Sequence, residues 1–455
     1  MNENTGCINR FPWRSRKGSY GAKGAEINEK IHGCYALDVR DDEIITNLNS
    51  ASLISANFHV MAKPIGPVCN LDCTYCYYLE KEKLFPKGEN FRMKPEVLES
   101  YIRQYAESQG TSEITFTWQG GEPTLLGVDY FRKIVTLEKK YAGGRPVHNA
   151  LQTNGTRLDH EWCHFFRENH FLVGLSIDGP RALHDTYRVD KGRKPTYDRM
   201  MHGLDLLKKH GVEFNTLTVV NASNVKHPLL VYDFLRETGS GYIQFLPLVE
   251  RLSMKGDGKH RLDFAEPSEP GQLPSSVIRW SVNAELYGDF LVQIFDQWVR
   301  RDVGKVFVQL FDVSLGIWAG KGAGLCLFLE DCGQAMALEH NGDLFSCDHF
   351  VYPKYHLGNI MNDSLKDMAD SLRQRSFGRT KSRTLPQYCL ECEVRFACNG
   401  ECPTRRFIKT PDGEDGLNYL CSAYKKFFHH VDPFMKQMTA LPHANRAPAE
   451  IMTRF

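Results

Sequence analysis

Three cysteines stand close together in the segment PIGPVCNLDCTYCYYLE (64–80). Cys69, Cys73 and Cys76 have C-x3-C-x2-C spacing, which lets three thiols of one tight loop converge on one metal centre. Three thiolates bind three irons of a 4Fe–4S cluster and leave the fourth iron open, and an open position is typical of catalytic metal sites. The alternative is a zinc site completed by a histidine. His59 is the nearest histidine upstream, but it falls near the start of the first predicted strand, far from the loop.

Eight further cysteines crowd the C-terminal third of the chain. Four of them have C-x2-C-x5-C-x3-C spacing, and the others are more widely separated. Eight thiolates suffice for two fully ligated iron–sulfur clusters, and equally for two zinc ribbons, because four cysteines suit either metal. Coupling to a redox-active centre upstream favours iron, since zinc cannot accept an electron. The eight residues are Cys326, Cys332, Cys347, Cys389, Cys392, Cys398, Cys402 and Cys421.

Bulk composition describes a folded protein of ordinary charge. The chain has 455 residues, 42% of them hydrophobic and 24% charged, and its formal net charge is +1. A protein with so little net charge has no overall electrostatic attraction to nucleic acid or to an anionic membrane, so neither is expected as a partner. No apolar run is long enough to cross a bilayer, and the N-terminus lacks the apolar core of a secretory signal. We therefore predict a cytoplasmic protein whose 14 cysteines stay reduced, and the cysteines clustered at short spacing indicate metal sites before disulfides.

An alternation of apolar runs and helical patterns must position the first cysteine loop. Helix-like segments such as 95–108 and 197–211 separate the apolar runs, and a longer helical stretch follows at 281–301. Six alternations indicate a parallel sheet of βα units, rolled into a partial (β/α)6 barrel. The six runs are 58–66, 113–121, 147–155, 171–179, 212–221 and 242–249.

Polar or glycine-rich residues follow each predicted strand. The first strand is followed by CNLDC, the second by QGGEP, and the next three by QTNG, SIDGP and VVN. A single glycine at a strand end is usually a turn. Because the carboxyl ends of barrel strands build active sites, five such ends in succession predict a site at the mouth of the barrel.

Three other segments fit this pattern less well. Residues 1–55 form an extension of mixed polar character, and residues 250–280 form an irregular connection rich in charge, Pro and Gly. The segment LRQRSFGRTKSR (372–383) contains five basic residues and no acidic one. A solvated helix end is the favoured interpretation of this segment, and a docking patch for an acidic partner is the alternative.

The ordered motifs resemble the radical S-adenosylmethionine superfamily over roughly residues 56–430. In that family the methionine moiety of the cofactor chelates the open iron bound by the three-cysteine loop. The resemblance implies that the GGEP backbone contacts the methionine amino group, and that Ser176 and Arg188 bind the ribose and the carboxylate. Adenine is expected near Tyr75 and near the backbone of Val249. The implied cofactor-binding residues are therefore Tyr75, Gly120, Gly121, Glu122, Ser176, Arg188 and Val249.

The C-terminal region resembles the SPASM iron–sulfur domain of peptide-modifying radical enzymes. The resemblance divides the eight cysteines into a first set of Cys326, Cys332, Cys347 and Cys402, and a second set of Cys389, Cys392, Cys398 and Cys421. With the cluster on the three-cysteine loop, three 4Fe–4S clusters and S-adenosylmethionine are the expected cofactors. The expected domains are an extension (1–55), the radical barrel (56–305), the SPASM domain (306–430) and a tail (431–455).

Within the superfamily, the motifs MAKPIGPVCNLDCTYCYYLEK, LQTNGT and SCDHFV are similar to those of the anaerobic sulfatase-maturating enzymes. That family oxidises a Cys or Ser side chain of a sulfatase to Cα-formylglycine. The resemblance implies that a 5′-deoxyadenosyl radical removes a β-hydrogen from the target residue, after which a proton and a second electron leave. The resemblance also implies that Asp348 accepts the proton, and burial beside a cluster could raise the pKa of this carboxylate toward the working range. His349 is the competing base, because an imidazole titrates near neutral pH.

The implied partners are a sulfatase polypeptide and a one-electron donor such as a flavodoxin or ferredoxin. Two other functions stay open on the sequence. One is another SPASM-type enzyme that forms thioether or carbon–carbon crosslinks in a ribosomal peptide. The other is a non-catalytic binding module stabilised by zinc, against which the intact GGEP and SIDG motifs count.

Overall fold

The computed structural model describes residues 58–251, 277–442 and 446–455. The predicted N-terminal extension and most of the predicted connection 250–280 lie outside the described residues.

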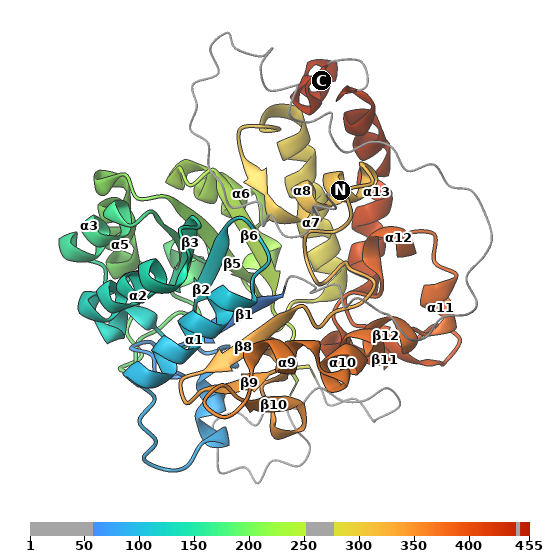
Figure 1. Cartoon of the computed structure of the whole chain (residues 1–455). Coiled ribbons are helices and arrows are strands. Elements are labelled where there is room, and N and C mark those ends of the chain that lie inside the picture. Colours follow the sequence, from blue (N-terminus) through green and yellow to red (C-terminus); the bar gives the residue numbers. More distant parts are fainter. Residues whose placement is uncertain (1–57, 252–276, 443–445) are drawn as a thin grey trace.

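A parallel sheet at the centre of the fold confirms the predicted alternation of strands and helices (Figure 1). Each of its first six strands pairs in parallel with the next one along the chain. The strands are β1 (His59–Lys63), β2 (Ile114–Trp118), β3 (Val147–Thr153), β4 (Phe171–Ser176), β5 (Phe214–Val220) and β6 (Tyr242–Pro247).

Helices connect the strands and bury one apolar face each against the sheet. In α1, for example, Val97, Leu98, Tyr101 and Ile102 are buried and follow helical spacing. The helix α5 ends at Gly211, which adopts a left-handed conformation that closes the last turn. The connecting helices are α1 (Pro95–Ser108), α2 (Val128–Tyr141), α3 (His160–Glu168), α4 (Arg181–His184), α5 (Tyr197–His210) and α6 (Pro228–Thr238), and α7 (Ala284–Arg301) follows β6.

The sheet continues beyond the predicted barrel on both sides. On one side β7 (Phe307–Val308) pairs in parallel with β6. On the other, β8 (Ala335–Glu339) pairs in parallel with β1 over five residues, and β9 (Asp343–Phe345) and β10 (His356–Asn359) add an antiparallel edge. The strands β1 to β10 therefore form one ten-stranded sheet, in which the C-terminal cysteine region is joined directly to the first barrel strand.

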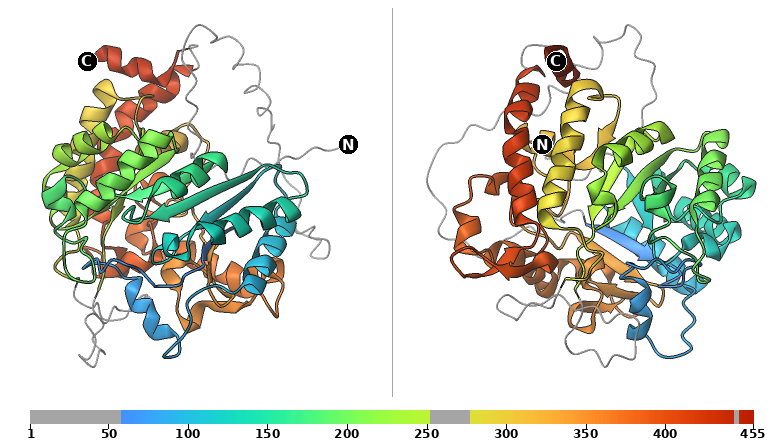
Figure 2. Two further views of the ribbon diagram at one scale, coloured as in Figure 1. Left: turned by 90° about the vertical axis from the view of Figure 1, so that its left-hand side faces the viewer. Right: turned by 180° about the vertical axis from the view of Figure 1, so that it is seen from behind.

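Short helices and a small hairpin complete the C-terminal region. Figure 2 shows the long helix α13 running alongside α7, and the two helices pack against each other. The elements are α8 (Gln309–Trp318), α9 (Leu365–Asp370), α10 (Leu372–Arg383), α11 (Gln387–Leu390), α12 (Arg395–Cys398), β11 (Arg406–Lys409), β12 (Asp415–Asn418) and α13 (Cys421–Ala440).

Candidate functional site

The three-cysteine loop follows β1 directly and holds its thiols near one another. The backbone N–H of Leu71 donates to Cys69 Sγ at 3.3 Å, and the N–H of Cys76 donates to the carbonyl of Cys73 at 3.1 Å. Burial raises the pKa of Cys73, Arg188 opposes this rise and the neighbouring Cys76 adds to it, and the result is a pKa of about 12. Neutral thiols in this environment become stable thiolates only with a positive partner, which bound iron provides.

The glycines after β2 let two loops approach closely. The N–H of Gly121 donates to the carbonyl of Gly66 at 2.7 Å, and the N–H of Glu122 donates to that of Val68 at 2.9 Å. A Cβ on Gly121 would lie 2.0 Å from the Val68 carbonyl oxygen, so no side chain fits. The GGEP turn therefore braces the segment that leads into Cys69.

Glu122 anchors this turn to the end of β3. Its buried carboxylate accepts hydrogen bonds from the backbone N–H groups of Thr124 and Asn154 and from the hydroxyls of Thr124 and Thr153, at 2.6–3.1 Å. Burial raises its pKa, and these donors counteract the rise. The Asn154 amide in turn donates to Asn70 Oδ1, beside Cys69, at 3.0 Å. The Glu122 side chain is thus occupied by the protein itself.

Tyr75 and Arg188, two predicted cofactor residues, meet at one buried carboxylate. Tyr75 donates from its hydroxyl to Asp178 Oδ2 at 2.5 Å, and Arg188 Nε lies 3.0 Å from the same oxygen. The Arg188 guanidinium also lies 5.7 Å from the centre of the Tyr75 ring. All three side chains are buried, as is Ser176 at the end of β4. Arg188 is therefore part of the interior of the site, not of a surface salt bridge.

Asp348 is held by residues of the barrel. Its carboxylate forms an ion pair with Lys63, at the end of β1, and accepts a hydrogen bond from the Tyr77 hydroxyl at 2.9 Å. Lys63 Nζ also lies 3.8 Å from the centre of the Tyr78 ring, and Tyr78 donates to the buried Glu339 at 2.9 Å. A network of charges and phenols thus joins β1, the cysteine loop and β8.

The pKa of Asp348 differs in direction from the sequence-based expectation. Burial alone raises it, but Lys63, the nearby His349 and the Tyr77 hydrogen bond together lower it to about 2. The expected rise was wrong because Lys63 is distant in sequence and its contact was not foreseen. His349, the competing base, stacks its ring on Tyr77 with centroids 5.9 Å apart.

The first set of four C-terminal cysteines is brought together in space. Cys326 and Cys402 each raise the pKa of Cys332 and of Cys347, after the larger effect of burial, which shows that the thiols are neighbours. The buried Lys381 donates to the carbonyls of Cys326 and Leu327 at 2.7 and 2.8 Å, as well as to that of Leu329. Asp348 follows Cys347 directly and so lies at this set.

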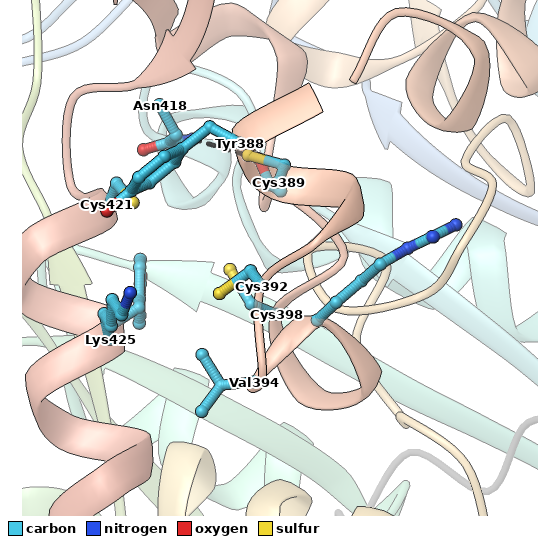
Figure 3. Close-up of a pocket in the computed structure, with 11 residues that line it drawn as sticks. Tyr388, Cys389, Cys392, Val394, Cys398, Asn418, Cys421 and Lys425 are labelled. Carbon is cyan, nitrogen blue, oxygen red and sulfur yellow. Dashed lines mark hydrogen bonds between the residues drawn. The ribbon is translucent and has the colours of Figure 1, made fainter. Parts of the chain in front are cut away.

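The second set lines one pocket. Figure 3 shows the thiols of Cys389, Cys392, Cys398 and Cys421 around this pocket, between α11, α12 and the start of α13. Lys425 and Tyr388 also line it. The predicted division of the eight cysteines therefore matches two separate places in the structure, although their roles as ligands stay predictions.

The described residues include no group of three His, Cys, Asp or Glu side chains placed to hold one metal ion. His59 contacts Tyr105 at 3.4 Å and is buried at the start of β1, as expected for a structural histidine.

Several site residues were not singled out from the sequence. Asp178 belongs to the SIDG motif and Lys63 to MAKP, so a charged residue at a strand end was an available signal for both. Glu339 and Lys381 carried no such signal, because each is buried by segments far away in the sequence. Val249 lies beyond the end of β6, partly buried against the main core.

Comparisons with known proteins agree with this architecture. The profile described as Radical SAM superfamily matches residues 64–235, and the profile described as Iron-sulfur cluster-binding domain matches residues 328–393. Fold and site together define a radical S-adenosylmethionine enzyme with a C-terminal SPASM domain. S-adenosylmethionine and 4Fe–4S clusters are its cofactors.

Two curated relatives and one solved structure place the chain more closely. A serine-type anaerobic sulfatase-maturating enzyme of Bacteroides thetaiotaomicron is 49% identical, covering 87% of this chain and 94% of its own length. A cysteine-type enzyme of Clostridium perfringens is 31% identical, covering 82% and 96%. The structure described as native anSMEcpe with bound AdoMet and Cp18Cys peptide has a TM-score of 0.72 at 30% identity, covering 84% and 98%. The chain belongs to the anaerobic sulfatase-maturating enzyme family.

This membership favours sulfatase maturation over the crosslinking and zinc-module functions that the sequence left open. No helix in the described part of the chain is long and apolar enough to cross a membrane.

Proposed function

We propose that this enzyme oxidises a serine side chain in a sulfatase polypeptide to Cα-formylglycine. Relatives named serine-type are 49%, 35% and 34% identical to this chain, whereas those named cysteine-type are 30% or 31% identical. The higher identity supports serine as the target over cysteine.

One observation carries the proposal: a single carboxylate lies between two cysteine groups. Asp348 follows Cys347 of the first C-terminal set, and it accepts a hydrogen bond from Tyr77, the neighbour of Cys76. A proton acceptor in this place suits an oxidation that removes a hydrogen atom, a proton and an electron from one carbon and its hydroxyl.

The residues present fit the cofactors of the family. Cys69, Cys73 and Cys76 would hold the cluster with the open iron, and the two C-terminal sets would hold one cluster each. Because the N–H groups of Gly121 and Glu122 already donate within the protein, this turn would bind an amino group through its carbonyl oxygens. Tyr75, Ser176, Arg188 and Val249 would surround the nucleoside and carboxylate. Bound there, S-adenosylmethionine and the cluster supply hydrogen-atom abstraction from the target carbon.

Asp348 would take the proton of the serine hydroxyl at a carboxylate oxygen. Lys63 keeps this carboxylate ionised, so it is ready to accept a proton at any pH at which the enzyme works. A weak base can accept this proton as the second electron leaves, because loss of that electron turns the hydroxyl of the substrate radical into that of a protonated aldehyde, which is strongly acidic. Tyr77 and Lys63 orient the carboxylate and limit its movement.

The test uses anaerobically reconstituted protein, a chemical reductant, S-adenosylmethionine and two sulfatase-motif peptides that differ only in Ser or Cys at the target. We expect formation of 5′-deoxyadenosine together with loss of two hydrogens from the serine peptide, at a higher kcat/KM than for the cysteine peptide. Deoxyadenosine without peptide oxidation would contradict sulfatase maturation. Preference for the cysteine peptide would overturn the choice of serine alone.

A further inference from the structure

The helix α10 has one face turned toward the first cysteine set. Gln374, Gly378 and Lys381 are buried on this face. The Gly378 carbonyl accepts a hydrogen bond from the N–H of Cys332 at 3.2 Å, and Lys381 donates to the carbonyl of Cys326 at 2.7 Å. Lys381 is thus not part of a solvated helix end, although the sequence favoured that interpretation. The buried face of α10 therefore packs against the loops that carry Cys326 and Cys332.

The opposite face of α10 carries three exposed arginines in line. Arg375, Arg379 and Arg383 are four residues apart, so they lie one above another on the helix surface. Leu372, 84% exposed, lies on the same face one turn before Arg375. We call these three arginines the arginine stripe. Figure 1 shows α10 beside α9.

The arginine stripe is poorly compensated by the protein's own acids. Arg375 lies 3.7 Å from Asp370, and within the described chain Arg379 and Arg383 form no ion pair. The helix contains no acidic residue, and its first turn, where anions would be favoured, carries arginine instead. Like charges four residues apart oppose helix formation.

Some exposed arginines elsewhere in the described chain are paired with acids, whereas Arg157 and Arg279 are exposed without an ion pair and lie on separate segments. Arg132 contacts Asp129 and Glu161 at 2.6 and 2.9 Å, and Arg199 contacts Asp190 at 2.8 Å. The arginine stripe differs from these single residues because it gathers uncompensated charge on one helix, in a chain whose net charge is only +1. Such a patch favours an acidic partner.

We infer that the arginine stripe is the docking surface for an acidic one-electron carrier protein. The inference rests on the proposed function, which needs a supply of electrons. Only the thickness of one helix, about 10 Å, separates the stripe from the loops of Cys326 and Cys332. Three arginines and a leucine on one helix suit the small contact of a transient redox complex. They are too few to bind nucleic acid strongly.

The transfer is a simple exchange. A reduced carrier of the flavodoxin class would lose one electron, and the cluster that the first set would hold would accept it. No bond is made or broken.

The test compares two variants of equal charge change. In the first, Arg375→Gln, Arg379→Gln and Arg383→Gln are combined; glutamine is a good helix former and removes the repulsion within the stripe. In the control, Lys133→Gln, Lys208→Gln and Lys209→Gln remove three exposed lysines on α2 and α5. Binding of a bacterial flavodoxin is measured at low salt, together with peptide oxidation driven either by reduced flavodoxin or by dithionite.

We expect the stripe variant to bind flavodoxin at least tenfold more weakly and to lose about tenfold in flavodoxin-driven rate at subsaturating carrier. Its dithionite-driven rate should match that of the wild type and of the control. Added salt should slow the wild-type flavodoxin reaction and change the variant little. The single Arg379→Gln variant should show a smaller loss of the same kind.

Equal flavodoxin binding by the stripe variant and the lysine control would overturn the inference. So would a stripe variant that loses affinity for the sulfatase peptide and retains its affinity for flavodoxin, since the acidic partner would then be the substrate. Failure of the proposed function looks different: the wild type would then oxidise no peptide with dithionite, while the binding comparison would still decide the docking surface.

Discussion

The two sets of four cysteines have the same number of thiols but different surroundings. The first set is built into the body of the protein, between the loop that follows β9, the face of α10 and the barrel residues Lys63 and Tyr77, which hold the adjacent Asp348. The second set lines a pocket formed by α11, α12, α13 and the end of β12, with Lys425 among the lining residues (Figure 3). The number of thiols therefore does not distinguish the first set, which lies beside the proposed proton acceptor, from the second set, which does not. What differs is the presence of a charged network linked to the barrel.

The largest expected effect comes from removing thiols in pairs. Replacing Cys347 and Cys402 by Ala should remove about four irons per chain and abolish peptide oxidation, because this set lies next to Asp348. Replacing Cys398 and Cys421 should also remove about four irons. This second variant should keep a single turnover, since the reacting groups are intact. Iron and sulfide analysis with a single-turnover assay measures both. Loss of about eight irons from either pair would mean that the two sets are not independent.

The next effect concerns the carboxylates beside each set. Asp348→Asn should lower peptide oxidation by about 10²-fold or more, the usual contribution of a proton-transfer group, with little change in S-adenosylmethionine binding. The matched change at the second set is Glu393→Gln, an exposed acid next to Cys392, which should leave the rate unaltered. Steady-state kinetics and equilibrium cofactor binding distinguish the two. An unaltered rate in the Asp348 variant would remove it as the proton acceptor.

The lysines beside the two sets should differ in their contribution to stability. Lys63→Met leaves the carboxylate of Asp348 without its buried partner, which should lower the free energy of unfolding by about 3 kcal/mol. Combining it with Asp348→Asn should recover part of the loss. Lys425→Met, at the rim of the second pocket, removes a solvent-exposed pair with Glu393 and should change stability little. Denaturant unfolding of the three variants checks this, and equal losses for both lysines would contradict the difference in burial.

The smallest effect tests how tightly α10 encloses the first set. In Gly378→Ala the new Cβ would lie 2.3 Å from the Cys332 carbonyl oxygen, and such overpacking should cost about 2 kcal/mol. The same change at Gly316 in α8 meets its nearest atom at 3.6 Å and should stabilise the helix by up to about 1 kcal/mol. Thermal unfolding should therefore shift in opposite directions. A rise in the unfolding temperature of both variants would show that α10 can move away from the Cys332 loop at little cost.

The strands and the local motifs followed from the sequence because their physical causes are local. Apolar runs separated by helical patterns are sufficient to predict β1 to β6, and the structure confirms their parallel order. The spacing of Cys69, Cys73 and Cys76 confines three thiols to one short loop. The pairing of β8 with β1 was not foreseen, since short strands after a long interval carry little signal of their partner.

Tertiary structure alone decided the electrostatics of the site. Lys63 and Asp348 are 285 residues apart in the chain, and their contact reverses the direction in which burial shifts the pKa of the carboxylate. Lys381 was expected on a solvated helix end and is instead buried at the carbonyls of the Cys326 loop. Residue types and spacing determined the prediction that cysteines hold metal in this protein, because thiols close in sequence are close in space. Which charges surround each set depends on segments that only the folded chain brings together, and those charges distinguish the first set from the second.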